Sequence, residues 1–401
     1  MSYYKENAWW ASPFNEVAEV ISKSKPKQKV EIHDATLRDG EQTPGVVFSK
    51  EDKIRIADKL VELGITRIEA GMPAVSKSDF EAIYEIAKKH DDAKIFTVVR
   101  TIKEEIDQAS DCGSYGIYLD IPIGYPKLQY QFKKWTWKDV YEKFVESIEY
   151  AHSKGLHVAL SQYDTTRARP DDLVNLDEAI TKNCPPDSIC IVDTVGCALP
   201  ATIDYMVRKI KKITNGMTVE VHTHNDFGLA VATELAGMAA GAEILHCCVN
   251  GLGERTGNAA LEELIICMKI LLGMDIPYKL ERMQELCDLV EEISGIPIAP
   301  NKPFAGRRNY TRESGMGVNL VVNQPLAMFA TDPRYFGKKG NIVLGKMSGK
   351  ASVLFYLDKL DMNIPTDEVI PEIVLKVKEF GMEKKRLLTE DEFVKIVQKY
   401  I

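Results

Sequence analysis

Short apolar segments alternate with amphipathic segments along most of the chain, at intervals of about 25 to 35 residues, a pattern typical of repeated strand-helix units around a parallel sheet. Eight apolar segments are predicted strands, namely residues 30–34, 67–70, 94–99, 116–121, 157–161, 188–193, 218–222 and 244–249. Between them, residues 50–63 and 138–154 place apolar side chains at spacings of three and four, which predicts helices. Eight such units close a barrel, so the predicted fold class is α/β, a (β/α)8 TIM barrel.

A doubly wound open sheet is the alternative architecture for this pattern. Such a sheet usually has fewer strands and a glycine-rich dinucleotide loop after the first, and this sequence has no such loop. The 401 residues suffice for a barrel of about 250 residues with an appendage. We predict an N-terminal arm over residues 1–29, a catalytic barrel over 30–275, and a linker with a mainly helical C-terminal subdomain over 276–401. The arm could pack against a partner subunit.

The composition is that of a soluble globular protein, with 45% hydrophobic and 27% charged residues. No apolar run approaches the roughly 18 residues of a membrane span, and the first ten residues lack the apolar stretch of a secretory signal, so a cytoplasmic enzyme is expected. A net charge of −8 disfavours nonspecific nucleic-acid binding. The expected partners are therefore small molecules, with neither nucleic acid nor membrane.

Polar residues gather where the predicted strands end. They follow strands one, five, six, seven and eight, at residues 34–42, 161–167, 193–194, 222–226 and 250–258. In an α/β barrel the carboxyl ends of the strands carry the chemistry. Five such clusters predict one functional site.

His222 and His224 close the seventh strand and are separated by one residue. Side chains at i and i+2 of a strand point to the same face, so both imidazoles can bind one divalent cation. A pair of surface histidines is the simpler alternative. The first strand end favours the metal site, because Asp39 can supply a hard oxygen ligand and Arg38 can clamp a carboxylate.

These residues lie in motifs that resemble the DRE-TIM metallolyase family, in its Claisen-condensing branch of 2-isopropylmalate, homocitrate, citramalate and Re-type citrate synthases. The resemblance covers most of residues 30–350, and its motifs are Leu-Arg-Asp-Gly-Glu-Gln at 37–42, Ile-Glu-Ala-Gly-Met-Pro-Ala at 68–74, Asp-Thr-Val-Gly at 193–196, His-x-His-Asn-Asp at 222–226 and Gly-Leu-Gly-Glu-Arg-Thr-Gly-Asn-Ala at 251–259.

The resemblance implies a set of roles for these residues. It implies a metal held by Asp39, His222 and His224, with Asn258 as a possible outer ligand. Arg38 and Thr194 would hold a 2-oxoacid, and Gln42, Asp120 and Asn258 are further predicted substrate contacts. The C-terminal subdomain is similar to one that completes the partner's active site in relatives, so a homodimer is expected.

The chemistry of the two substrates agrees with these roles. A 2-oxoacid chelates a cation through its carboxylate and ketone oxygens, and the cation then polarises the ketone towards the enolate of an acyl-CoA. Charge develops on the former ketone oxygen, where the metal and Arg38 can stabilise it. Two imidazoles with hard oxygens suit Mg, Mn or Zn, and the sequence does not choose among them.

The chain departs from the family pattern at the residues expected to move protons. No histidine follows His246, and Ser-Gln-Tyr-Asp at 161–164 replaces the usual Ser-x-Glu-Asp. The predicted substitutes are Tyr163, Asp164, Glu313 or a metal-bound water, with Tyr163 suited only if a nearby cation activates its phenol. Asp120 stands where relatives often carry a small hydroxyl residue, and it would favour an oxoacid with a hydroxyl or amine over a plain alkyl group.

Three functions are compatible with these residues. The leading hypothesis is an acyltransferase that condenses an acyl-CoA, most simply acetyl-CoA, with a 2-oxoacid to give a 2-hydroxy-2-alkyl dicarboxylate. The second is a metal-dependent carbon-carbon lyase on the same scaffold, although the sister lyase branch carries a catalytic cysteine where this chain has Glu254, Arg255 and Thr256. The third is a non-catalytic homologue that binds an oxoacid and a metal.

Overall fold

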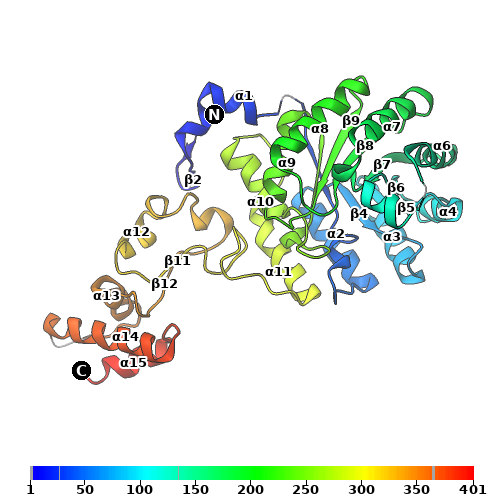
Figure 1. The fold of residues 1–401 in the computed structure, drawn as a ribbon. Coiled ribbons are helices and arrows are strands. Elements are labelled where there is room, and N and C mark those ends of the chain that lie inside the picture. The colour runs from blue at the N-terminus through cyan, green and yellow to red at the C-terminus, as the bar shows by residue number, and fades with distance from the viewer. Residues whose placement is uncertain (1–2, 27, 134, 364–365) are drawn as a thin grey trace. The chain divides into compact units, whose positions relative to one another are not determined.

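The computed structural model describes residues 3–26, 28–133, 135–363 and 366–401. It divides into two compact units, one of residues 14–298 and the other of residues 1–13 with 299–401. Figure 1 shows the barrel of the first unit in blue to yellow-green and the helices of the second in yellow to red. In the described part of the chain, no helix has both the length and the apolar character needed to cross a membrane.

The first unit is built on a closed barrel of eight parallel strands, in the order β10-β3-β4-β5-β6-β7-β8-β9 (Figure 1). The strands are β3 (Glu31–Asp34), β4 (Arg67–Gly71), β5 (Lys94–Arg100), β6 (Gly116–Pro122), β7 (His157–Tyr163), β8 (Ser188–Asp193), β9 (Thr218–Thr223) and β10 (Ile244–Cys247). Leu245 of β10 pairs with Ile32 of β3 on one side and Val221 of β9 on the other, which closes the ring. The predicted TIM barrel is confirmed, strand by strand.

Helices surround this barrel. They are α1 (Ala18–Ser24), α2 (Lys50–Leu63), α3 (Lys77–Lys89), α4 (Lys103–Asp111), α5 (Tyr125–Tyr130), α6 (Trp137–Ser153), α7 (Pro170–Asn183), α8 (Pro200–Ile213), α9 (Ala230–Ala240), α10 (Leu261–Ile266) and α11 (Met283–Ser294). Helix α2 shows how the sequence sets their bounds. A capping box of Ser49 and Asp52 begins it, and Gly64, with φ of +104°, ends it. Its Ile56 and Leu60 are fully buried.

The barrel unit extends to residue 298, beyond the boundary at 275 expected from the sequence. The reason is helix α11, which follows the barrel and packs back on it. Lys59 of α2 pairs with Glu285 at 2.7 Å, and Asn250 Nδ2 donates to the Cys287 carbonyl at 2.9 Å. These bonds join α11 to a barrel helix and to the loop after β10.

The second unit is mainly helical. Its elements are β1 (Tyr4–Lys5), β2 (Trp9–Trp10), β11 (Thr311–Arg312), α12 (Val318–Asn323), β12 (Asn341–Ile342), α13 (Lys350–Lys359), α14 (Ile370–Lys384) and α15 (Glu390–Val397). Leu344, Val353, Ile373 and Phe393 are among its core side chains. The mainly helical character expected of the C-terminal subdomain is confirmed.

The start of the N-terminal arm belongs to this second unit. The Trp10 amide donates to the Ala330 carbonyl at 2.8 Å, and the ring of Trp9 packs edge-on against Tyr335, so Trp9 is buried within its own chain. Trp10 and Phe14 remain exposed. Docking of the arm on a partner subunit stays a prediction.

Candidate active site

A cavity of about 220 Å³ opens at the carboxyl ends of the barrel strands. Its lining side chains come from strand ends and loops around the barrel, and they are Arg38, Asp39, Gln42, Glu69, Met72, Val98, Tyr118, Asp120, Ser161, Tyr163, Cys190, Val192, Thr194, His222, His224, His246 and Glu254. Polar residues from seven strand ends thus share one cavity, as the sequence predicts for a single site.

Asp39, His222 and His224 lie close together and are almost fully buried. His222 Nε2 is 3.3 Å from Asp39 Oδ2 and 3.4 Å from His224 Nε2, and His224 Nε2 is 3.7 Å from Asp39 Oδ2. Strand alternation brings both histidines to one face of β9, and the turn after β3 carries Asp39 to them. Two imidazole nitrogens and a carboxylate oxygen therefore converge, as the predicted metal site requires.

The charge states of these groups fit a cation. Burial opposes the charge on Asp39, but the Arg38 guanidinium and the contact with His222 outweigh it and hold the pKa of that carboxyl well below its usual range. Burial lowers the pKa of His224 to about 4, so its imidazole is neutral near pH 7. Ligation needs neutral imidazole and ionised carboxylate. The donor set suits a small divalent cation such as Mg, Mn or Zn.

The loop after β10 closes over this cluster. Asn258 is buried, its Nδ2 donates to the Leu252 carbonyl at 3.0 Å, and its Oδ1 has no hydrogen-bond partner among the described residues. Gly253 packs so tightly that a Cβ there would lie 2.2 Å from Asn258 Nδ2 and 2.9 Å from Asp39 Oδ1. Asn258 therefore lies beside the cluster with a free amide oxygen, a position compatible with its predicted outer-ligand role.

Arg38 reaches the cavity from the same turn as Asp39. Its Nη1 donates to Asp39 Oδ2 at 3.0 Å and to Gln42 Oε1 at 3.2 Å, and its Nε donates to the buried carboxylate of Glu69. Glu69 also contacts His33 Nε2 at 3.0 Å. The guanidinium is thus held on three sides at the cavity wall, where it can meet a substrate carboxylate.

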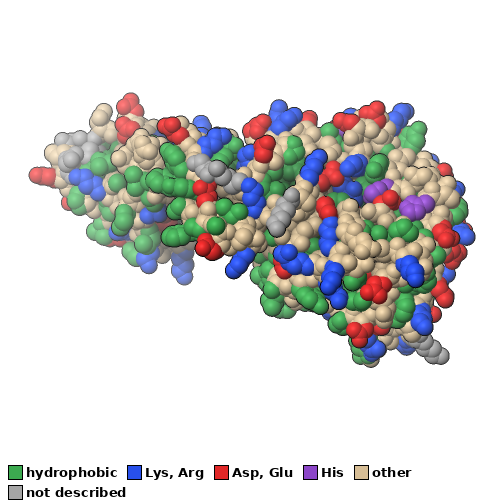
Figure 2. Space-filling model, turned by 90° about the horizontal axis from the view of Figure 1, so that it is seen from above, with side chains coloured by type: hydrophobic (Ala, Val, Ile, Leu, Met, Phe, Trp, Pro, Cys, Tyr) green, Lys and Arg blue, Asp and Glu red, His purple; other side chains and the backbone are tan. Residues whose placement is uncertain are grey.

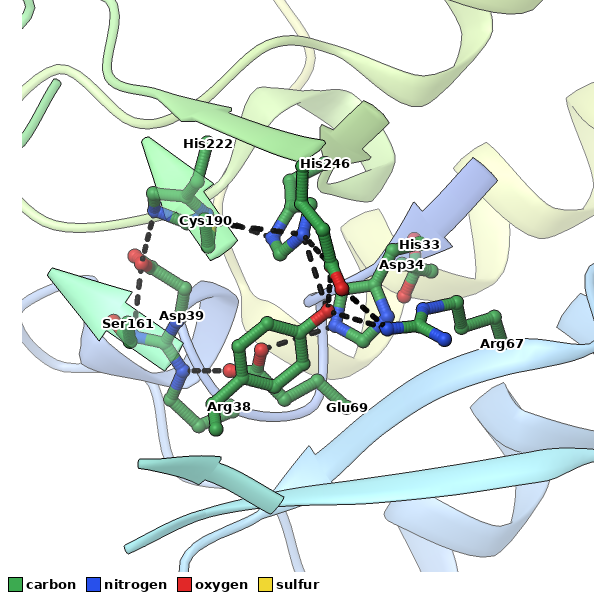
Figure 3. A network of polar contacts seen from close by, with 12 residues as sticks. His33, Asp34, Arg38, Asp39, Arg67, Glu69, Ser161, Cys190, His222 and His246 are labelled. Atoms are coloured by element: carbon green, nitrogen blue, oxygen red, sulfur yellow. Dashed lines mark hydrogen bonds and ion pairs between the residues drawn. The ribbon is translucent and has the colours of Figure 1, made fainter. Parts of the chain in front are cut away.

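A second layer of polar side chains lies deeper inside the barrel than the predicted metal ligands. Figure 3 shows its His246 and Arg67 to the right of Asp39 and His222. Glu220 Oε1 accepts from Arg67 at 2.8 Å and from Ser188 at 2.5 Å, while its Oε2 accepts from the Tyr118 hydroxyl. His246 lies between Glu220 and His222, with 2.9 Å from its Nε2 to Glu220 Oε2 and 3.3 Å from its Nδ1 to His222 Nδ1. This layer connects the barrel interior to a predicted metal ligand.

The opposite wall carries the remaining predicted substrate contacts. Ser161 Oγ donates to Asp120 Oδ1 at 2.8 Å, and burial raises the pKa of Asp120 to about 6. The Thr194 hydroxyl accepts from the Asp164 amide at 2.8 Å. Tyr163 lines the cavity, and although Lys127 Nζ lies 5.1 Å from its ring centre, burial raises the pKa of its phenol. The raised pKa keeps the phenol protonated near pH 7, and the role of Tyr163 in proton transfer stays a prediction.

Asp164 and Glu313 are placed differently from Tyr163. Asp164 is fully buried outside the cavity lining, and both its oxygens accept from Arg167, at 2.7 and 2.9 Å. Its carboxylate is committed to shaping the loop after β7, so the expected role in proton transfer is not supported. Glu313 belongs to the second unit, where its Oε1 accepts from the Met347 amide at 2.8 Å. Its role stays a prediction.

Sequence reasoning missed the supporting residues Glu69, Glu220, His33 and His246. A usable signal was present, because each is a charged or ionisable residue inside an otherwise apolar strand of a barrel whose interior is normally filled by branched apolar side chains. Glu220 also precedes His222 by two residues, which places both on the same face of β9.

Charged side chains of both signs also cover the surface. Figure 2 shows basic and acidic side chains interspersed over the face in view.

Comparisons with known proteins agree with this site. A family model described as HMGL-like matches residues 29–290. Homocitrate synthase AksA of Methanocaldococcus jannaschii is 39% identical over all of this chain and 97% of its own length, and a probable 2-isopropylmalate synthase of Ignicoccus hospitalis is 41% identical over 94% of this chain and 93% of its own. (R)-citramalate synthase CimA of M. jannaschii is 38% identical over 88% of this chain and 71% of its own.

Solved structures support the fold. A hydroxymethylglutaryl-CoA (HMG-CoA) lyase from Acinetobacter baumannii, in complex with coenzyme A and 3-methylmalate, superposes with a TM-score of 0.58 at 21% identity, over 67% of this chain and 92% of its own. The family resemblance inferred from the motifs is confirmed, and so is the expectation of an enzyme of the acyltransferase class. This chain belongs to the HMGL-like DRE-TIM family, in the branch of the Claisen-condensing synthases.

Proposed function

We propose that this protein is a divalent-metal-dependent synthase that condenses an acyl-CoA, most simply acetyl-CoA, with a 2-oxoacid. The observation that carries the proposal is the convergence of Asp39, His222 and His224 beside the guanidinium of Arg38 in one cavity. Its relatives named as homocitrate, 2-isopropylmalate and citramalate synthases support the same reaction.

The residues around the predicted metal site have the following parts in this proposal. Asp39, His222 and His224 would hold the cation, with Asn258 as an outer ligand. When bound, that cation would act as a Lewis acid towards the ketone of the oxoacid. Arg38 binds the oxoacid carboxylate and, fixed by Glu69, needs no reorganisation as negative charge develops.

The reaction forms one carbon-carbon bond and cleaves one thioester. A proton leaves the methyl carbon of acetyl-CoA, that carbon attacks the ketone carbon of the oxoacid, and the former ketone oxygen takes up a proton. Water then cleaves the thioester to release free CoA and a 2-hydroxy-2-alkyl dicarboxylate. Tyr163 is placed to donate a hydrogen bond, because its phenol lines the cavity in its protonated form.

The cavity wall also bears on which oxoacid is bound. Asp120 and Ser161 form a hydrogen-bonded polar pair there, next to the apolar Val98 and Val192. A plain alkyl side chain could make no hydrogen bond to this half-buried pair, which disfavours such a substrate. We therefore propose an oxoacid whose side chain carries a polar group.

A homodimer is proposed on the likeness of the C-terminal subdomain to that of the condensing synthases. Sedimentation of the full chain tests this directly. A monomer at the concentration used for assays would contradict it.

The experiment that tests the proposed reaction is release of free thiol from acetyl-CoA by the metal-loaded enzyme. The panel of 2-oxoacids is pyruvate, 2-oxoisovalerate, 2-oxoglutarate, oxaloacetate and glyoxylate, and Asp39→Ala is the blank. Thiol release with one oxoacid, absent in the blank, supports the synthase. If no oxoacid gives thiol release although metal is bound, that result would contradict acetyl-CoA condensation and favour a carbon-carbon cleavage reaction.

A further inference from the structure

We propose that a groove beside helix α5, outside the active-site cavity, binds the adenine nucleotide of the acyl-CoA substrate. This α5 groove has a volume of about 580 Å³, and its lining residues include Tyr125, Trp135, Trp137, Lys138 and Arg169. The volume lies within the range of about 300 to 1,000 Å³ of typical ligand sites. The inference rests on the proposed function, because it states where one part of a proposed substrate binds.

The segment of residues 122–138, which supplies most of this groove, has an unusual composition. It contains four lysines and no acidic residue, although the whole chain carries a net charge of −8. Five of its residues are aromatic, among them two of the four tryptophans of the chain. Basic side chains interleaved with aromatic rings can bind the phosphates and the base of a nucleotide together. The segment is therefore a local site for an anionic, aromatic ligand.

Three cations of this region have no acidic partner among the residues that the structure describes, and each lies near an aromatic ring. The Cζ atom of Arg169 is 4.1 Å from the centre of the Tyr125 ring, and Lys138 Nζ is 5.9 Å from the Trp137 ring. Lys127 Nζ contacts a ring in the same way. A ring holds a cation in place without neutralising it. Arg169 and Lys138 thus keep a positive charge that a phosphate can meet.

The indoles of Trp135 and Trp137 provide the surface for a base. Both side chains line the groove and are half-buried, and the Trp135 ring packs against Phe132 with 5.0 Å between ring centres. Purine bases stack on such rings. Asp172 also lines the groove, and its carboxylate can accept a hydrogen bond from the amino group of adenine. A guanine presents an oxygen at that position, so the groove favours adenine.

Helix α5 borders both the groove and the active-site cavity. Tyr125, at the start of α5, lines the groove, whereas Lys127 Nζ lies 5.1 Å from the ring centre of Tyr163, which lines the cavity. The Ile123 amide, just before α5, donates to the Tyr163 carbonyl at 3.0 Å. A helix is about 10 Å wide, a distance that the flexible pantetheine chain of CoA can cross. One acyl-CoA can therefore place its nucleotide in the groove and its thioester in the cavity.

The test uses variants of the full chain. Arg169→Gln combined with Lys138→Gln removes two exposed cations of the groove, and Trp137→Leu removes a stacking surface. Arg208→Gln, on an exposed arginine of α8 that pairs with Asp204 at 2.9 Å, is the matched control.

Two quantities are measured for each variant. The first is the Kd of adenosine 3′,5′-bisphosphate, which is the nucleotide part of CoA without the pantetheine chain, by isothermal titration with and without CoA as a competitor. The second is the ratio of kcat/KM for acetyl-CoA to kcat/KM for acetyl-pantetheine, which has the thioester but no nucleotide. A residue that contacts only the nucleotide changes this ratio, whereas general damage to the active site lowers both values of kcat/KM.

Wild type and Arg208→Gln are expected to bind the bisphosphate, and CoA is expected to displace it. In the double variant and in Trp137→Leu, we expect the Kd to rise and the ratio to fall by at least about 10-fold. The absence of bisphosphate binding in the wild type would overturn the proposal, and so would equal Kd values in the double variant and the control. Binding that CoA does not displace would indicate a site for free nucleotide and would contradict the acyl-CoA assignment. If Trp137→Leu fails to fold, the double variant decides.

Failure of the proposed function gives a different result. In that case the wild type releases no thiol from either thioester, while titration with the bisphosphate still reports whether the groove binds a nucleotide. If only the groove is wrong, the wild type releases thiol and the ratio is the same in the double variant and the control.

Discussion

The carboxylate of Glu69 accepts hydrogen bonds from Arg38 Nε and His33 Nε2 and so joins the cavity wall to the barrel interior. Arg38 opposes the cost of burying Glu69, and the pKa of Glu69 is lowered to about 2 against the effect of burial. Glu69 is therefore a fixed negative charge that orients the guanidinium. Arg38 can then turn its remaining N–H groups to a substrate.

The first prediction concerns this pair. Glu69→Gln keeps the size of the side chain but removes the charge that holds Arg38, so kcat/KM for the oxoacid is expected to fall by about 100-fold. Steady-state thiol release measures it. Glu62→Gln, which affects an exposed glutamate paired with Lys59 at 2.9 Å, is the matched control. Equal activity of the two variants would show that Glu69 does not position Arg38.

The second prediction concerns the backbone of the loop after β10. Gly253→Ala places a methyl group against Asn258 and Asp39, so metal affinity is expected to fall by at least about 10-fold. Gly45→Ala is the control. Both glycines have positive φ, +147° at Gly253 and +91° at Gly45, but nothing lies within 4 Å of a Cβ built at Gly45. Both variants carry backbone strain of about 1 to 2 kcal/mol. Isothermal titration with Mn²⁺ should separate them, and equal losses would mean that strain alone is responsible.

The third prediction concerns substrate preference. Asp120→Leu replaces the half-buried polar partner of Ser161 by an alkyl group. The ratio of kcat/KM for 2-oxoisovalerate to that for the preferred oxoacid is expected to rise by at least about 10-fold. Competition between the two oxoacids in one reaction, with products separated by mass spectrometry, gives this ratio directly. A ratio that stays constant would remove Asp120 from the specificity pocket.

The fourth prediction concerns stability and pH at Asp177. Burial raises the pKa of this α7 carboxyl from 3.8 to about 7, although Gln162 Nε2 donates to it. Because the folded state binds the proton more tightly than the unfolded state, this group stabilises the fold at low pH, and the stabilisation is lost as pH rises to about 7. Asp177→Asn removes the charge and can also donate to Gln162 Oε1, which has no hydrogen-bond partner among the described residues.

Asp177→Asn is therefore expected to unfold at higher urea than wild type at pH 8, by about 1 to 3 kcal/mol in the free energy of unfolding. At pH 4 the advantage should be much smaller, since wild-type Asp177 is then protonated. Asp171→Asn, on the exposed first turn of α7, should change stability little at either pH. A greater advantage at pH 4 than at pH 8 would contradict the raised pKa.

The sequence by itself determined the barrel and its central cluster. Strand and helix periodicity are local properties, so the eight strands and helix α2 could be predicted from spacing alone. His222 and His224 are also a local pattern, and Asp39 follows a strand end that parallel topology brings to the same rim. The family motifs added a predicted role for each of these residues.

Only the tertiary structure decided which residues support that cluster. Glu69 with Arg38, and His246 with His222, are contacts between strands that are distant in the sequence. The strand register and the pKa of each buried group depend on the closed barrel, because burial removes the water that would otherwise solvate the charges. The ion pair between Asp164, predicted from the sequence to help with proton transfer, and Arg167 was likewise visible only in the structure. Burial raises the pKa of Tyr163, so its phenol keeps its proton near pH 7.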